Sequence, residues 1–347
     1  ILINNWEGTY FDFTEEKLLQ MAEKAHQAGV ELFVLDDGWF GKRNNDTCSL
    51  GDWKVNYDKL PSGIDGLAEK INKIGMKFGL WFEPEMISPD SDLYREHPDW
   101  AIHIDEREGV QSRNQMVLDL SRDEVCEYVI NAVSDILANA NIEYVKWDMN
   151  RQLTDMPRLG YNHEYTLGYY KIMSAITEKF PNILFEGCSS GGGRFDAGVL
   201  AYMPQIWTSD NSDAIARLKM QYSTSMCYPV YSISSHVTAS PNHQCGRVTS
   251  LKTRADVAYC GTFGYELDVT KMSDEEFEEI KAQIKFEKRI QDLMCNGDLY
   301  RLINPYETNY CSWEVVSKDK KHIFVMACKV LAVAQTKSEK VKLQGLD

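Results

Sequence analysis

Side chains able to do chemistry are concentrated in the stretch 142–151, which reads IEYVKWDMNR. Its apolar half predicts a buried strand, and Lys146, Asp148, Asn150 and Arg151 come near or after the end of that strand. In parallel α/β folds, ligands bind at the carboxyl ends of the strands, so polar residues there indicate a site. Asp148 is therefore the leading candidate for a functional residue.

Similar polar and aromatic residues follow the other predicted strands: Asp36, Asp37, Trp39, Trp81, Glu83, Cys188, Arg194, Trp207, Asp210 and Asp213. Charged and amide groups can hydrogen-bond vicinal hydroxyls, whereas indole rings cover the C–H face of a sugar. The adjacent carboxylates of Asp36 and Asp37 would repel each other unless cations or a ligand satisfied them. The set predicts a pocket for a neutral, polyhydroxylated ligand.

Two carboxylates acting on a sugar suggest glycoside hydrolysis. Asp148 could attack the anomeric carbon, and Lys146, two residues earlier on the same strand face, could keep it ionised. Asp210 could protonate the leaving oxygen and then activate water, which requires a raised pKa. A carboxyl separation of about 5 to 5.5 Å would give retention, and a larger one inversion.

Several of these signals also have an ordinary structural explanation. Asp213 could simply cap a helix. The glycine-rich 188–194 lacks the GK[ST] ending of a phosphate loop, so a tight turn is expected. His236 and His243 fall in a predicted loop without metal-ligand spacing, so we expect no metal. The Glu-rich segment 274–287 is expected to be a solvated helix face.

Composition restricts the class of protein. The 347 residues are 44% apolar and carry a formal net charge of −15, which argues against nucleic-acid or anionic-membrane partners. No apolar stretch predicts a membrane span, and no signal peptide opens the chain. Nine cysteines without CxxC pairs favour a reducing compartment, so we expect a cytoplasmic location. Since the chain starts at Ile1 rather than Met, we expect it to be part of a longer polypeptide.

Short apolar runs alternate with amphipathic helical windows, as in repeated βα units. The predicted strands are 1–6, 31–37, 77–82, 142–151, 183–186, 205–208, 230–234 and 264–268. The predicted helices are 14–28, 67–74, 123–139, 165–180, 214–227, 250–259 and 274–294. Eight βα units predict an α/β fold of the (β/α)8 TIM barrel type, whose strand ends all lie on one face.

Beyond Tyr300 the pattern changes to two alternating, strand-like segments, 310–317 and 322–329. They predict the start of a C-terminal antiparallel β domain. We therefore expect a catalytic barrel over 1–300 and a truncated β domain over 301–347.

Six motifs in this order resemble the bacterial α-galactosidases, or melibiases, of glycoside hydrolase family 36. They are DDGW (36–39), GLWFEPE (79–85), KWDMNR (146–151), CSSGGGRFD (188–196), WTSDNSD (207–213) and NHQ (242–244). The resemblance implies a (β/α)8 catalytic domain and retention through a covalent galactosyl-enzyme. It also implies no metal or other cofactor, and α-galactoside oligosaccharides such as melibiose, raffinose and stachyose as substrates.

Carried over residue by residue, the resemblance makes Asp148 the nucleophile and Asp210 the acid/base. The other residues that it assigns to substrate binding are Asp36 and Asp37 at O4 and O6, Lys146 and Arg113 on the O3 and O4 side, Trp6, Trp81 and Trp207 as walls, Asn150, and Cys188 with Ser190 at O2. Ser190 occupies a place that is often Gly in relatives.

The resemblance also implies an N-terminal β-sandwich domain, which this chain lacks, and a homotetramer for the full-length protein. Three alternatives to α-galactosidase activity stay open. The first is an α-N-acetylgalactosaminidase, if the Cys188 turn leaves room for a 2-acetamido group. The second is galactosyl transfer to sugar acceptors, and the third is a non-catalytic carbohydrate-binding barrel.

Overall fold

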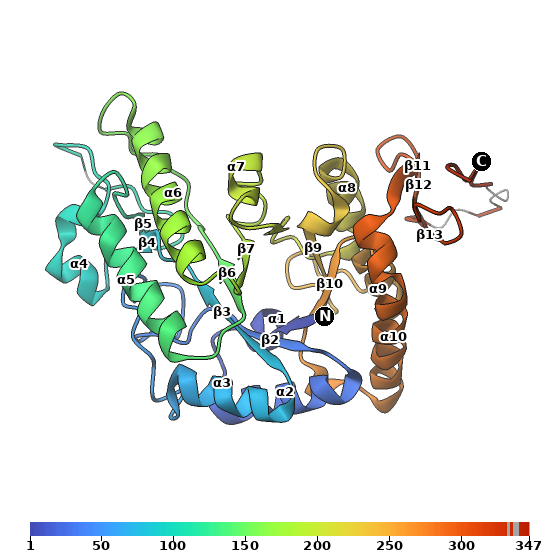
Figure 1. The fold of residues 1–347 in the computed structure, drawn as a ribbon, viewed down its shortest axis with the longest axis horizontal. Coiled ribbons are helices and arrows are strands. Elements are labelled where there is room, and N and C mark those ends of the chain that lie inside the picture. The colour runs from blue at the N-terminus through green and yellow to red at the C-terminus, as the bar shows by residue number, and fades with distance from the viewer. Residues whose placement is uncertain (108, 332–333, 336–339, 347) are drawn as a thin grey trace.

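Eight parallel strands close into a barrel in the computed structural model, which describes residues 1–107, 109–331, 334–335 and 340–346 (Figure 1). Their order around the barrel is β1-β10-β9-β8-β7-β6-β3-β2. The strands are β1 Leu2–Asn4, β2 Leu32–Leu35, β3 Lys77–Phe82, β6 Tyr144–Trp147, β7 Leu184–Gly187, β8 Gln205–Trp207, β9 Ile233–Thr238 and β10 Thr262–Glu266. The predicted (β/α)8 barrel is confirmed.

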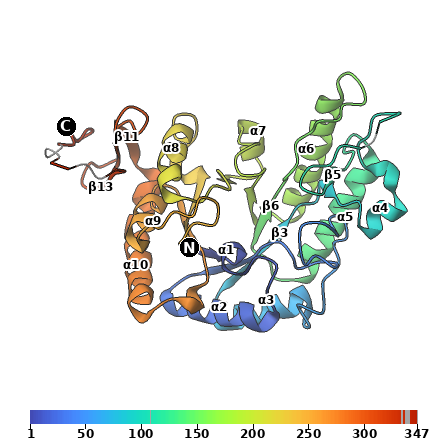
Figure 2. The same ribbon diagram turned by 180° about the vertical axis from the view of Figure 1, so that it is seen from behind.

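Helices surround the barrel strands, and α10 packs against α2 and α9 (Figure 2). The α-helices are α1 Trp6–Thr9, α2 Glu15–Ala28, α3 Gly63–Ile74, α4 Asp92–Glu96, α5 Asp123–Asn139, α6 Tyr161–Lys179, α7 Ala197–Leu200, α8 Ala214–Thr224, α9 Leu251–Ala258 and α10 Asp274–Asn296. The 3-10 helices of the described residues are η1 Pro98–Trp100, η2 Val230–Ser232 and η3 Val269–Lys271. In the part of the chain that the structure describes, no helix combines the length and the apolar character needed to cross a membrane.

Local chemistry explains where the helices begin. The Thr14 hydroxyl accepts a hydrogen bond from the Lys17 amide ahead of α2. Ser273 and Glu276 form a capping box at the start of α10. The first strand is shorter than predicted because Oδ1 of Asn4 accepts the amide of Trp6 (2.7 Å) and the chain turns into α1. This places Trp6 on a helix above the barrel rather than in a strand.

Two further sequence expectations, on the seventh strand and on His236, are wrong. The seventh strand begins at Ile233 instead of residue 230, because 230–232 form η2, and it continues to Thr238. His236 therefore lies within a strand and not in a loop. The solvated face expected for α10 is present, with Glu275, Glu276 and Glu278 exposed, but the opposite face is buried and includes Glu287, which is 4% exposed.

The C-terminal segment forms an antiparallel sheet of β11 Asp298–Ile303, β12 Tyr310–Val316 and β13 Ile323–Lys329. The two predicted strands are confirmed there, whereas β11 was not predicted. β11 spans residue 300, where the sequence suggested dividing 1–300 from 301–347, and that division stays a prediction. Its second part includes 332–333, 336–339 and 347, which lie outside the described residues.

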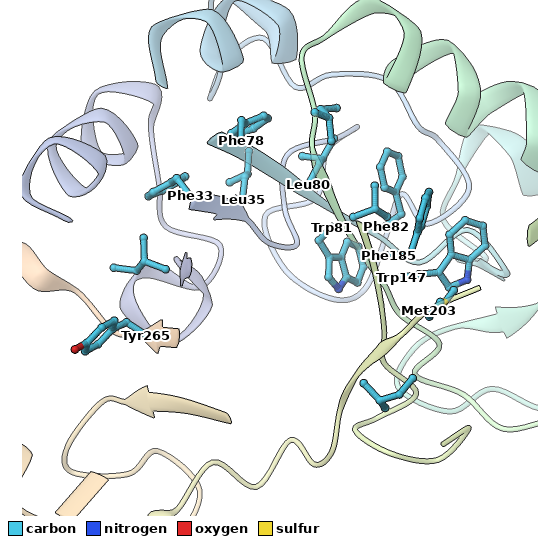
Figure 3. Packing of buried hydrophobic residues seen from close by; sticks show 14 of the residues in the cluster. Phe33, Leu35, Phe78, Leu80, Trp81, Phe82, Trp147, Phe185, Met203 and Tyr265 are labelled. Atoms are coloured by element: carbon cyan, nitrogen blue, oxygen red, sulfur yellow. The ribbon is translucent and has the colours of Figure 1, made fainter. Parts of the chain in front are cut away.

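The barrel strands that lead to the candidate site rest on an aromatic core. Trp81, Phe82, Trp147 and Phe185 from β3, β6 and β7 are almost completely buried (Figure 3). Trp147 is part of this core, and its indole N–H donates to Glu85 Oε1 (2.9 Å). In the long connection after β3, a short antiparallel pair, β4 Met86–Ile87 and β5 Met116–Val117, holds the segment that carries Arg113. Rigid packing of this kind fixes the positions of the strand ends.

Candidate active site

One cavity of about 270 Å³ lies at the carboxyl ends of the barrel strands. It is lined by Trp6, Glu7, Tyr10, Phe11, Asp36, Asp37, Asp46, Trp81, Arg113, Lys146, Asp148, Asn150, Trp207, Asp210, His243, Gln244 and Glu266. Ten of the twelve residues predicted for the site are in this lining. The other two, Cys188 and Ser190, are not in the lining but contact residues that are.

Asp148 is held at the end of β6 by the strand next to it. Its amide donates to the Phe82 carbonyl (2.7 Å), which continues the pairing of β6 with β3. Its carboxylate accepts three hydrogen bonds: Oδ1 from the Met149 amide (2.8 Å), and Oδ2 from Asn150 Nδ2 (2.7 Å) and Trp81 Nε1 (3.2 Å). Three donors on a buried carboxylate fix its orientation and compensate its negative charge.

Asp210 lies in the loop after β8, three residues beyond Trp207. Gln244 Nε2 donates to its backbone carbonyl (2.6 Å), and the Cys188 thiol lies 4.0 Å from its Oδ1. Burial raises the pKa of the Cys188 thiol, and Asp148 lies close enough to it for its negative charge to act in the same direction. Both carboxyl groups therefore lie next to one sulfur atom.

The surroundings of Asp210 suit a proton donor. Burial, followed by the negative charge of Asp148, raises the pKa of Asp210 to about 6. The positive charges of Lys146 and Arg113 act in the opposite direction but do not cancel this rise. A carboxyl group that holds its proton into the mildly acidic range can serve as a general acid.

The glycine-rich turn after β7 packs directly against the segment that carries Asp210. A Cβ on Gly191, whose φ is +88°, would lie 2.5 Å from the Ser209 Cα. A Cβ on Gly192 would lie 2.7 Å from the Thr208 carbonyl oxygen. Only glycine permits this approach. The expected tight turn is therefore present, and it packs against the loop that carries Asp210.

Ser190, in the same turn, has a left-handed backbone with φ +46°. Such a conformation is costly for a residue with a side chain, which agrees with the place being often Gly in relatives. The Ser190 hydroxyl donates to Asn150 Oδ1 (3.3 Å) and accepts from Arg113 (3.5 Å). Ser190 thus links Asn150 and Arg113, which line the cavity, although Ser190 itself does not.

Each of the adjacent carboxylates after β2 has its own cation. Asp36 Oδ2 accepts from Lys146 Nζ (2.8 Å). Asp37 accepts two hydrogen bonds from Arg43, from Nε (2.7 Å) and Nη2 (2.8 Å). Burial raises the pKa of Asp37, although Arg43 opposes the rise. The sequence left a ligand and cations open as partners of this pair; the structure pairs both carboxylates with cations, of which Arg43 was not predicted.

Lys146 carries the positive charge nearest to the floor of the cavity. Burial lowers its pKa, but the negative charges of Asp36 and Glu266 outweigh burial and raise the pKa well above its ordinary value. Lys146 is therefore a cation and can donate hydrogen bonds to ligand hydroxyls.

Trp207 forms an aromatic wall that other side chains hold in place. The His236 ring lies 4.6 Å from it, centroid to centroid, and the Arg217 guanidinium lies 4.3 Å from its ring centroid. His236 Nδ1 is 3.1 Å from Glu266 Oε2, so this histidine orients a carboxylate that lines the cavity. Among the described residues there is no cluster of three or more histidine, cysteine, aspartate or glutamate side chains that could hold a metal ion.

Sequence reasoning missed seven cavity residues: Glu7, Tyr10, Phe11, Asp46, His243, Gln244 and Glu266. The NHQ motif contained His243 and Gln244 without giving them a role. Glu266 ends the eighth strand, a position that could have identified it. The others lie on α1 or in loops, where no periodic pattern marks them.

Glu7 is the central member of this missed set. It accepts from the Ser212 hydroxyl (2.5 Å) and the Ala239 amide (3.2 Å). His243 Nδ1 lies 3.2 Å from its Oε1, and this hydrogen bond raises the pKa of His243. A positive His243 at the cavity wall would therefore be paired with Glu7.

Two predicted candidates have structural roles instead. Arg194 donates two hydrogen bonds to Glu85 (2.9 and 2.8 Å) and stays outside the cavity lining. Asp213 caps α8 by accepting a hydrogen bond from the Ala216 amide (3.0 Å), which is the structural alternative that its sequence position left open. The Arg194 contact joins the turn after β7 to the connection after β3, and the Asp213 contact satisfies an amide in the first turn of α8.

Comparison with known proteins gives consistent matches over the chain. Residues 1–297 match the family model for melibiase, and residues 310–347 match the model for the glycosyl hydrolase family 36 C-terminal domain. Alpha-galactosidase AgaA of Geobacillus stearothermophilus is 53% identical, over 100% of this chain and 49% of its own. Alpha-galactosidase Mel36A of Lactobacillus acidophilus is 49% identical, over 100% and 48%.

Solved structures of α-galactosidases also match the fold over the whole chain. The crystal structure of AgaA superposes with a TM-score of 0.98, covering 100% of this chain and 49% of AgaA. The galactosidase domain of the AgaSK α-galactosidase–sucrose kinase of Mediterraneibacter gnavus gives 0.99 at 48% identity, covering 100% and 48%. AgaA variants have been solved in complex with raffinose and with stachyose. The chain spans about half the length of the curated relatives it matches.

Proposed function

Because the chain belongs to the melibiase family of glycoside hydrolases, family 36, we propose that its barrel removes terminal α-linked galactose from oligosaccharides such as melibiose and raffinose. The observation that carries this proposal is that Asp148 and Asp210 share one cavity with Lys146 and Trp207. At about 270 Å³ the cavity suits one sugar ring rather than a long chain segment. The α-galactosidase names of the relatives, and the raffinose and stachyose bound to AgaA variants, support the substrate class.

The two carboxyl groups divide the reaction between them. The Asp148 carboxylate attacks the anomeric carbon and forms a galactosyl ester while Asp210 gives its proton to the leaving oxygen. Asp210, now ionised, then takes a proton from water, which attacks the ester and releases galactose with its α configuration retained. The three hydrogen bonds on Asp148 and the raised pKa of Asp210 support this assignment of roles.

The remaining polar groups of the cavity bind the sugar. Asp36 and Asp37 accept hydrogen bonds from its O4 and O6 hydroxyls, and Lys146 and Arg113 donate on the O3 and O4 side. The indoles of Trp6, Trp81 and Trp207 cover the apolar ring face, and Asn150 with the Cys188 turn faces O2. A homotetramer and a cytoplasmic location, both expected from the sequence, complete the proposal and are tested by native mass and by cell fractionation.

The test compares an aryl α-galactoside with an aryl α-N-acetylgalactosaminide, in this chain and in the longest natural polypeptide that contains it. We expect turnover of the galactoside and release of α-galactose first, observed by proton NMR. Preference for the acetamido sugar, or release of β-galactose first, would contradict the proposal. Transfer to an added sugar acceptor in place of hydrolysis would favour a transferase.

Asp148→Asn tests the nucleophile. It should lower kcat by about 10³-fold or more while leaving galactose binding largely intact, because the amide keeps the shape of the side chain. The matched control is Asp105→Asn, since the Asp105 side chain is fully exposed and should not affect turnover. Equal losses of binding and turnover in Asp148→Asn would contradict the assignment.

A further inference from the structure

A second buried acid, Glu83, lies directly behind Asp148. It follows β3, is 1% exposed and does not line the cavity. Its Oε1 accepts hydrogen bonds from the Asn150 backbone amide (2.5 Å) and from Gln115 Nε2 (3.2 Å). The side chain of Asn150 in turn donates to Asp148 Oδ2 (2.7 Å). One residue, Asn150, therefore bridges two buried carboxyl groups.

The surroundings do not supply a cation for both acids. The charged groups that face Glu83 are Asp148, Arg43 and Asp37. Arg43 already makes two hydrogen bonds to Asp37. Within the described part of the chain, neither Glu83 nor Asp148 forms an ion pair with a lysine or an arginine. Two neighbouring buried carboxylates without such a partner cannot both ionise at low cost.

The hydrogen bonds decide which acid keeps the proton. Asp148 has three donors spread over both of its oxygens, whereas among the described residues the two donors to Glu83 both reach Oε1. Negative charge is therefore better compensated on Asp148. Burial, followed by the charge of Asp148, raises the pKa of Glu83 to about 8.

Gln115 offers a partner for a proton on Glu83. Its Oε1 is buried and has no hydrogen-bond partner in the structure. Turning the amide over would exchange its nitrogen and oxygen, so that the oxygen faces Glu83. A protonated Glu83 could then donate to that oxygen, while the amide nitrogen would take the place that the oxygen occupies now.

We propose that Glu83 is a positioning residue that holds a proton at neutral pH, so that Asp148 alone is ionised and Asn150 is held in place between the two acids. The assignment rests on the proposed function, since it takes Asp148 as the nucleophile. When Glu83 ionises, its charge repels that of Asp148 across Asn150 and makes the ionised form of Asp148 less favourable. Activity then falls with the titration of a group that never touches the substrate.

Infrared spectroscopy tests the proton directly and needs no turnover. We expect the parent protein to show a carbonyl band of a protonated carboxylic acid that disappears near pH 8, and Glu83→Gln to lack that band. Glu287→Gln is the matched control, because Glu287 is a second buried acid at a distance from the cavity lining, with a pKa raised to about 7. It should lose a different band. Absence of a Glu83-dependent band would overturn the proposal.

Kinetics test the consequence. For an aryl α-galactoside, whose leaving group needs little protonation, kcat of the parent should show an inflection near pH 8. Glu83→Gln should lower neutral kcat less than about tenfold, leave KM unchanged and remove the inflection, because the amide accepts the same hydrogen bonds without ionising. Glu287→Gln should keep the parent profile.

Gln115→Met gives a second variant in case Glu83→Gln does not fold. It keeps the ionisable acid but removes its partner, so the inflection should move to another pH rather than vanish. An inflection at the parent's pH in both Glu83→Gln and Gln115→Met would overturn the proposal. If the parent does not hydrolyse galactosides, the proposed function fails, and the infrared band still decides whether Glu83 carries the proton.

Discussion

Gly191 lies so close to Ser209 that a Cβ added to it would be 2.5 Å from the Ser209 Cα. The two residues belong to loops that follow neighbouring strands, β7 and β8, and Asp210 comes directly after Ser209. Backbone cannot yield to such a contact in the way that the end of a flexible side chain can. The glycine turn thus sets the position of the proposed acid/base through backbone packing.

Replacing Gly191 by alanine should therefore damage catalysis. We expect Gly191→Ala to lower kcat/KM about 100-fold, because a shift of about 1 Å in a catalytic group has an effect of that size. The control is Gly160→Ala, at a glycine that also has a positive φ (+82°) but no atom within 4 Å of the added Cβ. Both variants should lose stability from the strained backbone, as measured by thermal unfolding. Equal kcat/KM in the two variants would contradict the argument.

The buried pair of Arg43 and Asp37 should stabilise the fold as well as the site. Arg43→Met leaves Asp37 charged and unpaired, which should lower the free energy of unfolding by about 3 to 5 kcal/mol. The control is Arg95→Met, since the Arg95 side chain is 56% exposed and its solvent-screened pairs with Asp90 and Asp92 should contribute little to stability. Urea denaturation of both variants measures the difference. Similar losses would argue against the buried pair as a structural element.

Asp210 should set the alkaline side of the pH profile for natural substrates. The leaving oxygen of raffinose needs a proton, and Asp210 carries one only below its pKa of about 6. We expect kcat/KM for raffinose to fall about tenfold per pH unit above this value. In Asp210→Asn the dependence should disappear together with most of the activity. A profile for raffinose that stays flat well above pH 6 would contradict the acid/base role.

Glu287 should make the stability of the protein depend on pH. Burial raises its pKa from 4.5 to about 7, so the folded state favours its protonated form. The stability that this carboxyl contributes is complete below about pH 4.5 and is lost as the pH rises through about 7. Glu287→Gln should thus gain up to about 3 kcal/mol over the parent near pH 8 and nothing near pH 4.

Thermal and urea unfolding at both pH values check the Glu287 prediction. Glu278→Gln is its control, because Glu278 lies on the same helix with its side chain 69% exposed. It should change the free energy of unfolding by less than about 1 kcal/mol at either pH. An advantage of Glu287→Gln that is equal at the two pH values would point to packing rather than ionisation.

The barrel could be predicted because each strand and helix has a local pattern of apolar residues in the sequence. Buried strands such as 77–82 read as continuous apolar runs, and helices such as 123–139 have apolar residues at helical spacing and turn-forming flanks. Since a barrel places all strand ends on one face, the strand-end residues Asp148, Lys146 and Trp207 could be assigned to a common site. The predicted element boundaries were wrong where the apolar run was short, as at η2, whose residues were predicted to be part of a strand.

The sequence by itself determined the fold class, the family and most of the cavity lining, because strand-end position and short motifs depend on neighbours along the chain. Only the tertiary structure decided which charges meet: Arg43 with Asp37, Glu7 with His243, and Glu83 with Asn150 behind Asp148. Glu7 and His243, and Glu83 and Asn150, come from different elements, and Arg43 meets Asp37 only because the loop after β2 folds back on itself, so no regular spacing in the sequence records these pairs. Their protonation depends on burial and on charges within a few ångströms, and both exist only once the barrel has closed.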